Sequence, residues 1–328
     1  MAALLTGRNP RIAVVGGMNM DLSIYVDRLP AAGESVEGSH TVRGPGGKGL
    51  NQAVAARRLG ASVRLAGMIG TDMFGDELLT EVACAGLDPS WIGRTSEAAT
   101  GLALIVIGPD GNNMITAVAG ANRKLSGQGL PALDSWLSGS DVIMLQLEVP
   151  IEVCLAVASA ARSQAVTVML NAAPMPPTVD RNLAELLGLT DLLVVNQTEA
   201  SRLDAALAGD ATKAVPTSRD ALDLAVRIRD AGPGIVVVTM GADGAIGAGS
   251  DGPCVVNSFP VKAVDTVGAG DVFCAQLAVA WAMGKHPLAE AVRLACAAGA
   301  LATTYRGIKS SMPDSDEVAA LVALHPRL

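Results

Sequence analysis

The run DVIMLQL at residues 141–147 opens a series of short apolar segments that decides the fold. Similar segments are IAVVG (12–16), VTVML (166–170), DLLVVN (191–196) and IVVVTM (235–240). Helical patterns lie between them, for example at residues 152–163. Short, continuous apolar runs separated by helices are typical of parallel strands buried on both faces. With right-handed crossovers, the sequence predicts an α/β protein: a three-layer α/β/α sandwich with a mostly parallel central sheet.

Two segments break this alternation. Residues 22–43 contain proline, glycine and period-two pieces, and residues 100–118 have the pattern of a hairpin with an Asp110-Gly111 turn. Strands outside the helix alternation predict a small β-strand lid formed by about residues 20–45 and 98–118. Residues 205–220 have the composition of a surface loop. No linker or repeat divides the chain, so residues 1–328 are expected to form one domain with this lid.

The composition excludes several classes of protein. Half of the 328 residues are apolar but only 2% are aromatic, and the formal net charge of −8 gives no footprint for nucleic acid. Five scattered cysteines form no C-x-x-C pattern, which favours a reducing cytoplasm. Three scattered histidines suggest neither a zinc site nor a Ser/His/Asp triad. No apolar run is long enough for a membrane span, so no membrane partner is expected.

The stretch VDTVGAGDVF at residues 264–273 is the strongest chemical motif. Small residues lead into a helix expected at about 271–283, ended by Gly284. The amides of Gly268, Ala269 and Gly270, together with the helix dipole, would form an anion hole for a transferring phosphoryl group. Asp271 then lies where a hydroxyl would attack and is the candidate catalytic base. Alternatively, Asp271 only complements the helix dipole.

A glycine-rich stretch, GPGGKGLNQ at residues 44–52, enters another helix that Gly60 ends. It matches neither the P-loop nor the dinucleotide-binding pattern. We expect it to carry Lys48 and Asn51 into a cleft as donors to sugar hydroxyls, although an ordinary helix-entry turn is the alternative.

Seven segments in order resemble motifs of the ribokinase family, the PfkB-type carbohydrate kinases. They are residues 17–21, 46–52, 119–122, 146–148, 196–199, 239–244 and 265–271, and the resemblance runs from about residue 12 to 313. It implies a ribokinase-like fold. It also implies an ATP-dependent kinase that transfers the γ-phosphoryl group to a primary hydroxyl of a small sugar, D-ribose above others, to give D-ribose 5-phosphate.

The resemblance also assigns a sugar site. Its residues are Asn19, Asp21, Gly47, Lys48, Asn51 and Glu148. Carboxylates accept hydrogen bonds from sugar hydroxyls, while amide and ammonium groups donate to oxygens. Glu148 also follows a predicted strand, where an acid can make an ordinary cap, and that alternative stays open.

A nucleotide site and two cation sites follow from the same resemblance. ATP is expected at Asn196, Thr239, Gly241, Gly244 and Gly270, with Glu199 in the magnesium region. Asn196 and Glu199 also fit a helix capping box, which is compatible with that role. The resemblance places a potassium activator at Asp265, Val267, Gly307 and Ser311. For Asp265, a turn residue is the alternative.

Several positions depart from the family pattern. Leu50 replaces a common alanine and could crowd the sugar, Gln276 replaces a small residue, and Cys296 stands where a bulkier polar residue is common. Residues 171–174 (NAAP) lack one proline of the family's usual motif.

Other functions remain open on the sequence alone. A kinase for deoxyribose, fructose, a ketodeoxy sugar acid or a nucleoside is possible on the same fold, although the few aromatic residues disfavour a nucleoside base. A sugar- or nucleotide-sensing protein is the non-enzyme alternative, and the absent dinucleotide pattern disfavours a nicotinamide dehydrogenase. Unpaired lid edges predict a homodimer.

Overall fold

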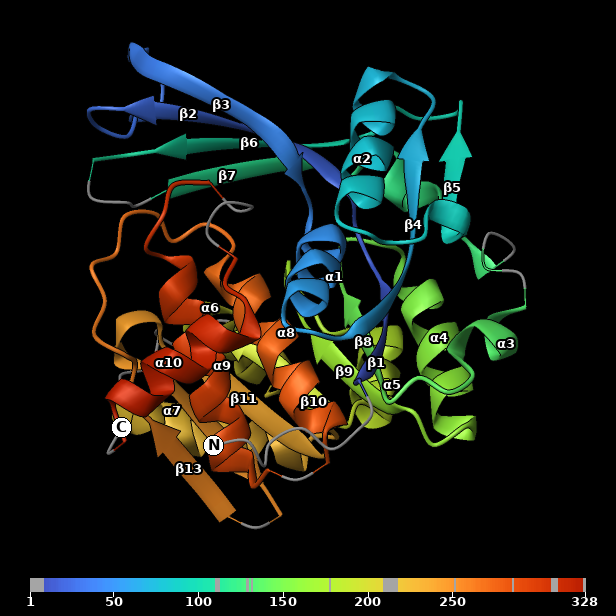
Figure 1. Ribbon diagram of the computed structural model, residues 1–328, viewed down its shortest axis with the longest axis vertical. Helices are drawn as coiled ribbons and strands as arrows, with labels where there is room; N and C mark the ends of the chain where they lie inside the picture. Colours follow the sequence, from blue (N-terminus) through green and yellow to red (C-terminus); the bar gives the residue numbers. More distant parts are fainter. Residues whose placement is uncertain are drawn as a thin grey trace.

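The computed structural model describes residues 9–109, 113–127, 130, 132–176, 178–208, 218–250, 252–284, 286–307 and 312–326. A nine-stranded sheet runs through the centre (Figure 1). Its order is β13 (Gly252–Val256), β12 (Ala245–Gly249), β11 (Ile235–Thr239), β10 (Leu192–Asn196), β9 (Thr167–Asn171), β8 (Val142–Gln146), β1 (Arg11–Val15), β4 (Ser62–Gly70) and β5 (Ile92–Thr95). The pairs β11–β12 and β12–β13 are antiparallel, and the other neighbouring pairs described for this sheet are parallel. The predicted sandwich with a mostly parallel sheet is confirmed.

Helices cover both faces of this sheet. They are α1 (Lys48–Arg58), α2 (Met73–Cys84), α3 (Leu133–Leu137), α4 (Ile151–Ser163), α5 (Arg181–Leu189), α6 (Gln197–Leu207), α7 (Ser218–Asp230), α8 (Ala269–Ala282), α9 (Leu288–Ala302) and α10 (Ser315–Leu324). Alternate residues of β1 enter two cores: Ile12 and Val14 pack with α1, α8 and α9, and Ala13 and Val15 pack with α4 to α7. None of the described helices has the length and apolarity needed to cross a membrane.

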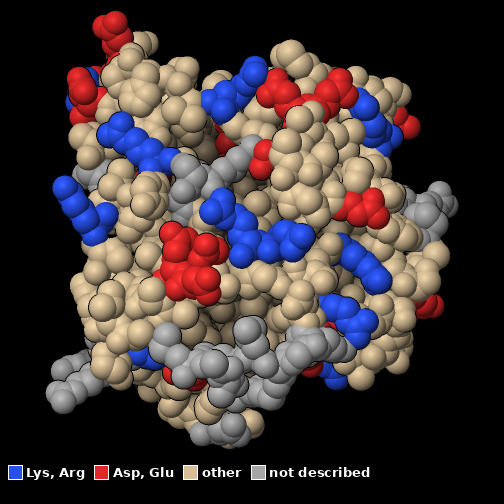
Figure 2. All heavy atoms as spheres, viewed as in Figure 1, with Lys and Arg blue, Asp and Glu red and all other residues tan. Residues whose placement is uncertain are grey.

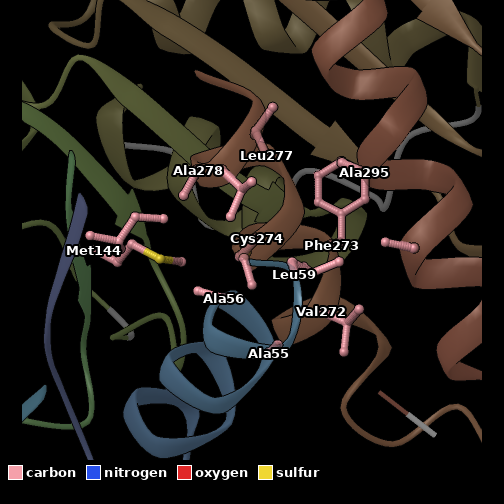
Figure 3. Packing of buried hydrophobic residues seen from close by; sticks show 14 of the residues in the cluster. Ala55, Ala56, Leu59, Met144, Val272, Phe273, Cys274, Leu277, Ala278 and Ala295 are labelled. Carbon is pink, nitrogen blue, oxygen red and sulfur yellow. The ribbon is translucent and has the colours of Figure 1, made fainter. Parts of the chain in front are cut away.

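Small side chains let α1 and α8 pack closely. Ala55 and Ala56 of α1 meet Cys274 and Ala278 of α8 in a core that also contains Met144 (Figure 3). Because both helices are buried along most of their length, their N-terminal ends are held at fixed positions. This contact brings the glycine-rich stretch next to the start of α8.

Four further strands form a separate small sheet. Its order is β3 (Gly38–Gly46), β2 (Asn19–Val26), β6 (Gly101–Ile107) and β7 (Asn113–Val118). It projects beside the sandwich, as expected for strands outside the helix alternation (Figure 1). The predicted Asp110-Gly111 turn lies outside the described residues.

The predicted surface loop at 205–220 needs a correction at both ends. Helix α6 continues to Leu207, and α7 already begins at Ser218. Residues 209–217 lie outside the described part of the chain.

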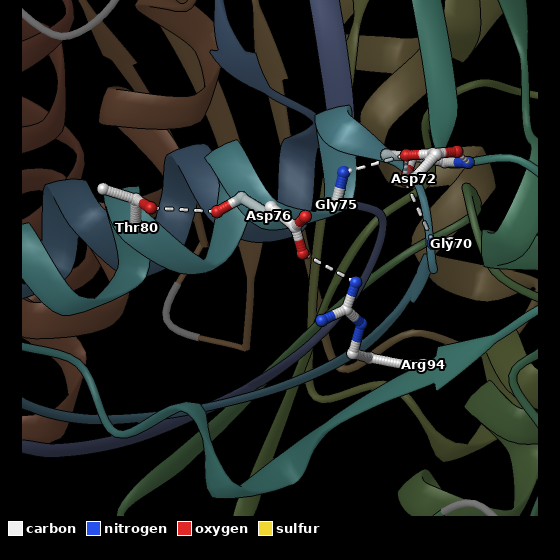
Figure 4. Close-up of polar contacts among 7 residues, drawn as sticks. Gly70, Asp72, Gly75, Asp76, Thr80 and Arg94 are labelled. Atoms are coloured by element: carbon white, nitrogen blue, oxygen red, sulfur yellow. Dashed lines mark hydrogen bonds and ion pairs between the residues drawn. The ribbon is translucent and has the colours of Figure 1, made fainter.

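A polar junction ties the small sheet to the sandwich (Figure 4). Asp72, the N-cap of α2, accepts hydrogen bonds from the Gly75 amide at 2.9 Å and from the amide and hydroxyl of Thr100, both at 2.7 Å. Thr100 Oγ1 in turn accepts from the Gly70 amide at 3.0 Å. Partial burial raises the pKa of Asp72, but these hydrogen bonds outweigh it and the pKa is lowered. The start of β6 is therefore anchored to the end of β4.

Candidate active site

Asp271 lies in the first turn of α8, which begins after Gly268 in a left-handed conformation (φ 83°). Only 7% of Asp271 is exposed. The first amides of a helix have no acceptor within it, and the dipole adds positive potential there. The Ala269 amide already donates to the Thr266 carbonyl oxygen at 3.3 Å, so an anion hole at Gly268, Ala269 and Gly270, beside the buried carboxylate, stays a prediction.

Two amide groups from α1 hold this carboxylate. Asn51 Nδ2 donates to Asp271 Oδ2 at 2.9 Å, and Gln52 Nε2 donates to Asp271 Oδ1 at 3.0 Å. Both donors are buried. The two motifs that the sequence singled out thus meet at Asp271, and Asn51 reaches the candidate base itself.

Glu148 joins the start of α1 to the start of β2. Its Oε2 accepts from the Lys48 amide, the first of α1, at 2.7 Å, and its Oε1 accepts from Asn19 Nδ2 at 3.3 Å. Glu148 therefore does cap a helix, but the capped helix is α1, far from it in sequence. Burial raises the pKa of Glu148 and nearby Asp271 adds to this, while Lys48 and Asn19 oppose it.

Asp21 and Lys48 complete a group of close charges. Burial, with Glu148 and Asp271 nearby, raises the pKa of Asp21 to about 7. For Lys48, burial alone would lower the pKa, but Asp271, Glu148 and Glu199 outweigh it and the pKa is raised. One ammonium therefore stands among several carboxylates, an arrangement able to both donate to and accept from hydroxyl groups.

Asn122 supports the sugar-side cluster from outside. Its Nδ2 donates to Asn19 Oδ1 at 2.8 Å, and its Oδ1 accepts from the Met18 amide at 2.9 Å. Asn122 is fully buried just after the small sheet. It fixes the orientation of the Asn19 amide, so that its Nδ2 faces Glu148.

A cavity of about 770 Å³ lies beside the N-terminus of α8, where Ala269 and Gly270 line it. All five residues predicted for ATP line it: Asn196, Thr239, Gly241, Gly244 and Gly270. Apolar side chains, among them Phe259 and Phe273, form another part of the wall, with Cys296 of α9. The cavity thus combines backbone-rich turns with an apolar surface, which suits a nucleotide.

The capping box at the start of α6 is present. The Glu199 amide donates to Asn196 Oδ1 at 2.8 Å, and the Asn196 amide donates to Glu199 Oε2 at 2.9 Å. Burial nevertheless raises the pKa of Glu199, and its charge interacts with Lys48 and Asp271. Glu199 therefore both caps its helix and stands near the site.

Asp265 joins two loops. Its Oδ1 accepts from the Val267 amide at 3.0 Å, as in an ordinary turn, and its Oδ2 accepts from the distant Gly307 amide at 3.1 Å. The second contact joins residues 42 positions apart in the sequence, so it is not part of a turn. It holds the loop before α8 to the loop after α9. Ser311, the last residue of this predicted cation site, lies outside the described residues. Each carboxylate oxygen keeps a lone pair that fits a large monovalent cation.

The small sheet packs onto the same loop. Ala103, Ile105 and Ile107 of β6 form an apolar cluster against which Val267 packs. The Arg306 guanidinium lies 5.8 Å from the ring centre of Tyr25 in β2. The small sheet therefore contacts both loops that Asp265 joins.

Comparison with known proteins identifies the family. Residues 9–315 match the family described as pfkB family carbohydrate kinase. The chain belongs to this family. The ribokinase of Haemophilus influenzae is 33% identical over 306 residues, 93% of this chain and 96% of the relative. The deoxyribokinase of Salmonella typhi is 30% identical over 315 residues, 96% of this chain and 99% of the relative.

Solved structures agree with this carbohydrate-kinase assignment. The ribokinase from Thermotoga maritima gives a TM-score of 0.81 at 31% identity, covering 96% of this chain and 99% of that one. The Arabidopsis thaliana ribokinase complexed with ribose and ATP gives 0.81 at 29% identity, with the same coverage. The predicted family, ribokinase-like fold and sugar-kinase activity are confirmed.

The departures from the family pattern have distinct places in the kinase. Leu50, expected to crowd the sugar, packs into the hydrophobic core with 2% exposure. Gln276 is buried on α8, and Cys296 lines the large cavity. Burial raises the pKa of Cys296 to about 12, so its thiol is neutral at physiological pH.

On the face shown in Figure 2, acidic and basic side chains are interspersed.

Three functional candidates of the kinase were missed in sequence: Gln52, Gln146 and Asn122. Each stands inside a motif that the sequence analysis quoted, and each is buried. Gln146 Nε2 donates to Gln52 Oε1 at 2.7 Å, and Gln52 Nε2 also lies 3.2 Å from Asn171 Oδ1. For Gln146, a polar residue at the end of an otherwise apolar strand was the available signal.

Proposed function

We propose that this kinase transfers the γ-phosphoryl group of ATP to the primary hydroxyl of D-ribose, forming D-ribose 5-phosphate and ADP. One observation carries the proposal: the buried Asp271 carboxylate at the start of α8 lies between the polar sugar-side cluster and the large cavity. The ribokinase relatives, one of them solved with ribose and ATP, support the choice of sugar and nucleotide.

Asp271 would act as general base. Its carboxylate takes the proton from the sugar hydroxyl while that oxygen attacks the γ-phosphorus, and the bond from phosphorus to the ADP oxygen breaks. The amides of Gly268, Ala269 and Gly270 stabilise the negative charge at the phosphoryl oxygens. Such catalysis depends on positioning and electrostatics, without a covalent intermediate.

The sugar would be held by the cluster of Asn19, Asp21, Gly47, Lys48, Asn51 and Glu148. Asn19 and Glu148 are already oriented by Asn122 and the Lys48 amide, respectively. Asp21, with a pKa of about 7, can donate or accept a hydrogen bond near neutral pH. Closure of the small sheet over the sugar would exclude water and limit ATP hydrolysis.

Magnesium and potassium would assist. The described residues contain no cluster of three acidic, cysteine or histidine side chains suited to a metal. Mg²⁺ would be held mainly by water and phosphates, with Glu199 nearby. Mg²⁺ would neutralise charge on the phosphates, and K⁺ at Asp265 would stabilise the anion-hole loop. Turnover should therefore be faster in potassium than in sodium buffer.

A homodimer would form through the small sheet. Leu104, Met114 and Val118 share its outer face and are 41%, 52% and 64% exposed. The opposite face carries Ala103, Ile105 and Ile107, which are buried. An apolar outer face and open strand edges favour a second copy of the chain as partner. The five cysteines, all free, fit a cytoplasmic location.

A coupled ADP-release screen tests the proposal. The purified kinase is given ATP and pentoses, deoxyribose, hexoses, ketodeoxy sugar acids or nucleosides, with and without potassium. D-ribose should give the highest kcat/KM. A higher value for deoxyribose or fructose would change the sugar, a higher value for adenosine would make this a nucleoside kinase, and binding without turnover would indicate a sensor.

A further inference from the structure

A chain of buried amides leads from the central sheet to the candidate base. Gln146, the last residue of β8, donates from Nε2 to Gln52 Oε1 at 2.7 Å. Gln52 donates from Nε2 to Asp271 Oδ1 at 3.0 Å. Both glutamines have 0% exposure, so neither is placed to contact a sugar or nucleotide directly.

The direction of this chain is fixed. Only the nitrogen end of an amide can donate to a carboxylate, and a flipped Gln52 would turn its oxygen toward Asp271 Oδ1. The bond from Gln146 Nε2 occupies Gln52 Oε1 and opposes that flip. Asn171 Oδ1, 3.2 Å from Gln52 Nε2, also requires a donor there. Three neighbours therefore agree on one orientation of the Gln52 amide.

A glutamine at position 146 is expected to lower the stability of the fold. It follows Met144 and Leu145 in a fully buried strand, and its Oε1 has no hydrogen-bond partner among the described residues. A Cβ at Gly16 would lie 1.8 Å from that oxygen, so glycine is needed beside it. A buried acceptor without a partner costs free energy that an apolar side chain would not. Such a local conflict is expected where a residue serves function.

We propose that Gln52 is a positioning residue for the base Asp271, and that Gln146 acts through Gln52 by setting its orientation. The proposal rests on the proposed function, in which Asp271 accepts the proton. With Asn51 on Oδ2 and Gln52 on Oδ1, the orientation of the carboxylate is fixed. Each oxygen keeps a lone pair to receive the hydroxyl proton.

The first test is Gln52→Met, which keeps the side-chain length and removes both polar ends. Loss of a hydrogen bond to a charged group corresponds to roughly a 10- to 150-fold fall in kcat. KM for ribose and for ATP should stay within about threefold, because Gln52 touches neither ligand. A purely structural role would lower the melting temperature and leave kcat of the folded enzyme unchanged.

Double variants separate the links of the chain. Gln146→Met alone should lower kcat less than Gln52→Met, and it should cause no further loss when Gln52 is already Met. In an Asp271→Asn background, Gln52→Met should also have no further effect on kcat. Gln276→Met, a buried amide on the same helix as Asp271, serves as the matched control and should keep wild-type kcat.

The outcomes are decisive because wild-type turnover is measured first. Absence of sugar phosphorylation by the wild type would refute the proposed function. An active wild type with Gln52→Met as fast as the control would refute the positioning role alone. Fully additive losses in Gln52→Met/Gln146→Met would refute the action of Gln146 through Gln52.

Discussion

The proposed sugar side and the proposed nucleotide side of the site are built in different ways. On the sugar side, Asn19, Glu148 and Asp271 are held by side chains and amides that are themselves buried. On the nucleotide side, a cavity of about 770 Å³ is lined by turns at Gly241 and Gly244 and by an apolar wall. One side is ordered by side-chain networks, and the other by backbone shape.

The difference indicates that the orientation of side chains matters most on the sugar side, and the shape of the backbone on the nucleotide side. Carboxylates must be oriented before reaction, since a hydrogen-bonded base loses little freedom when the substrate arrives. A nucleotide needs backbone amides and room, which glycine turns provide without side chains. Polar substitutions on the sugar side should therefore change rates, and backbone changes on the nucleotide side should change ATP affinity.

The largest effect is expected for Asp271→Asn. The substitution keeps the shape and the helix dipole but removes the proton acceptor, so kcat should fall by about 10²–10⁴-fold while ATP still binds. Steady-state kinetics and calorimetric ATP titration measure this. Asp76→Asn, which changes the first-turn acid of α2, is the matched control and should keep activity. If Asp271 only complements the dipole, both variants lose about 0.3–1 kcal/mol of stability and neither loses rate.

A smaller but selective effect is expected for Glu148→Ala. Sugar hydroxyls lose a charged acceptor, so kcat/KM for ribose should fall by roughly 10- to 150-fold. The Kd for ATP should change far less, because Glu148 belongs to the sugar side. Glu152→Ala, at an exposed acid in the first turn of α4, is the control. Unchanged ribose kinetics in the folded Glu148 variant would remove it from the site.

Two neighbouring glycines test the nucleotide side. Gly241 and Gly244 both have positive φ, but a Cβ at Gly241 meets open space, while one at Gly244 would lie 2.0 Å from the Val256 carbonyl oxygen. Each alanine variant carries backbone strain of about 1–2 kcal/mol, and only Gly244→Ala adds a backbone clash. ATP affinity and melting temperature should therefore fall more for Gly244→Ala, with ribose KM kept. Equal losses would show that shape at this turn is not limiting.

The smallest effect is a pH-dependent gain in stability for Asp21→Asn. The folded pKa of Asp21 is about 7 against a usual value of 3.8, so the folded state binds the proton more tightly. Stability is therefore lost as pH rises from about 4 to 7, and the full penalty applies above 7. Removing the charge should therefore raise the melting temperature at pH 8, with a smaller difference at pH 4.5. A pH-independent difference would contradict the raised pKa.

Much of the fold could be predicted because the apolar strand runs are local signals. The parallel strands β1, β8, β9, β10 and β11 follow them, and the small sheet follows the break in alternation. The short strands β5, β12 and β13 were missed. β12 is the glycine-rich AIGAG, and β13 is a partly exposed edge strand. Such strands exist because a neighbour offers free backbone groups, which the sequence does not display.

The candidate site was predictable in its members and less so in its contacts. Motif order indicated Asp271, Lys48 and Glu148, and the structure brings them together. The order of the motifs did not indicate that Gln52 would face Asp271, because that contact depends on how closely α1 packs on α8. The raised pKa of Asp21 likewise depends on acids from distant elements. Tertiary packing sets these properties.

The position of the transferred phosphate tests most directly whether the kinase phosphorylates the primary hydroxyl of D-ribose. The kinase is incubated with ATP and D-ribose, and the product is examined by proton-coupled phosphorus NMR. Transfer to the primary hydroxyl places the phosphate on a methylene carbon, so its signal should be split by coupling to two protons. A doublet would mean transfer to the anomeric or a secondary hydroxyl, and it would contradict the account, as would the absence of any sugar phosphate.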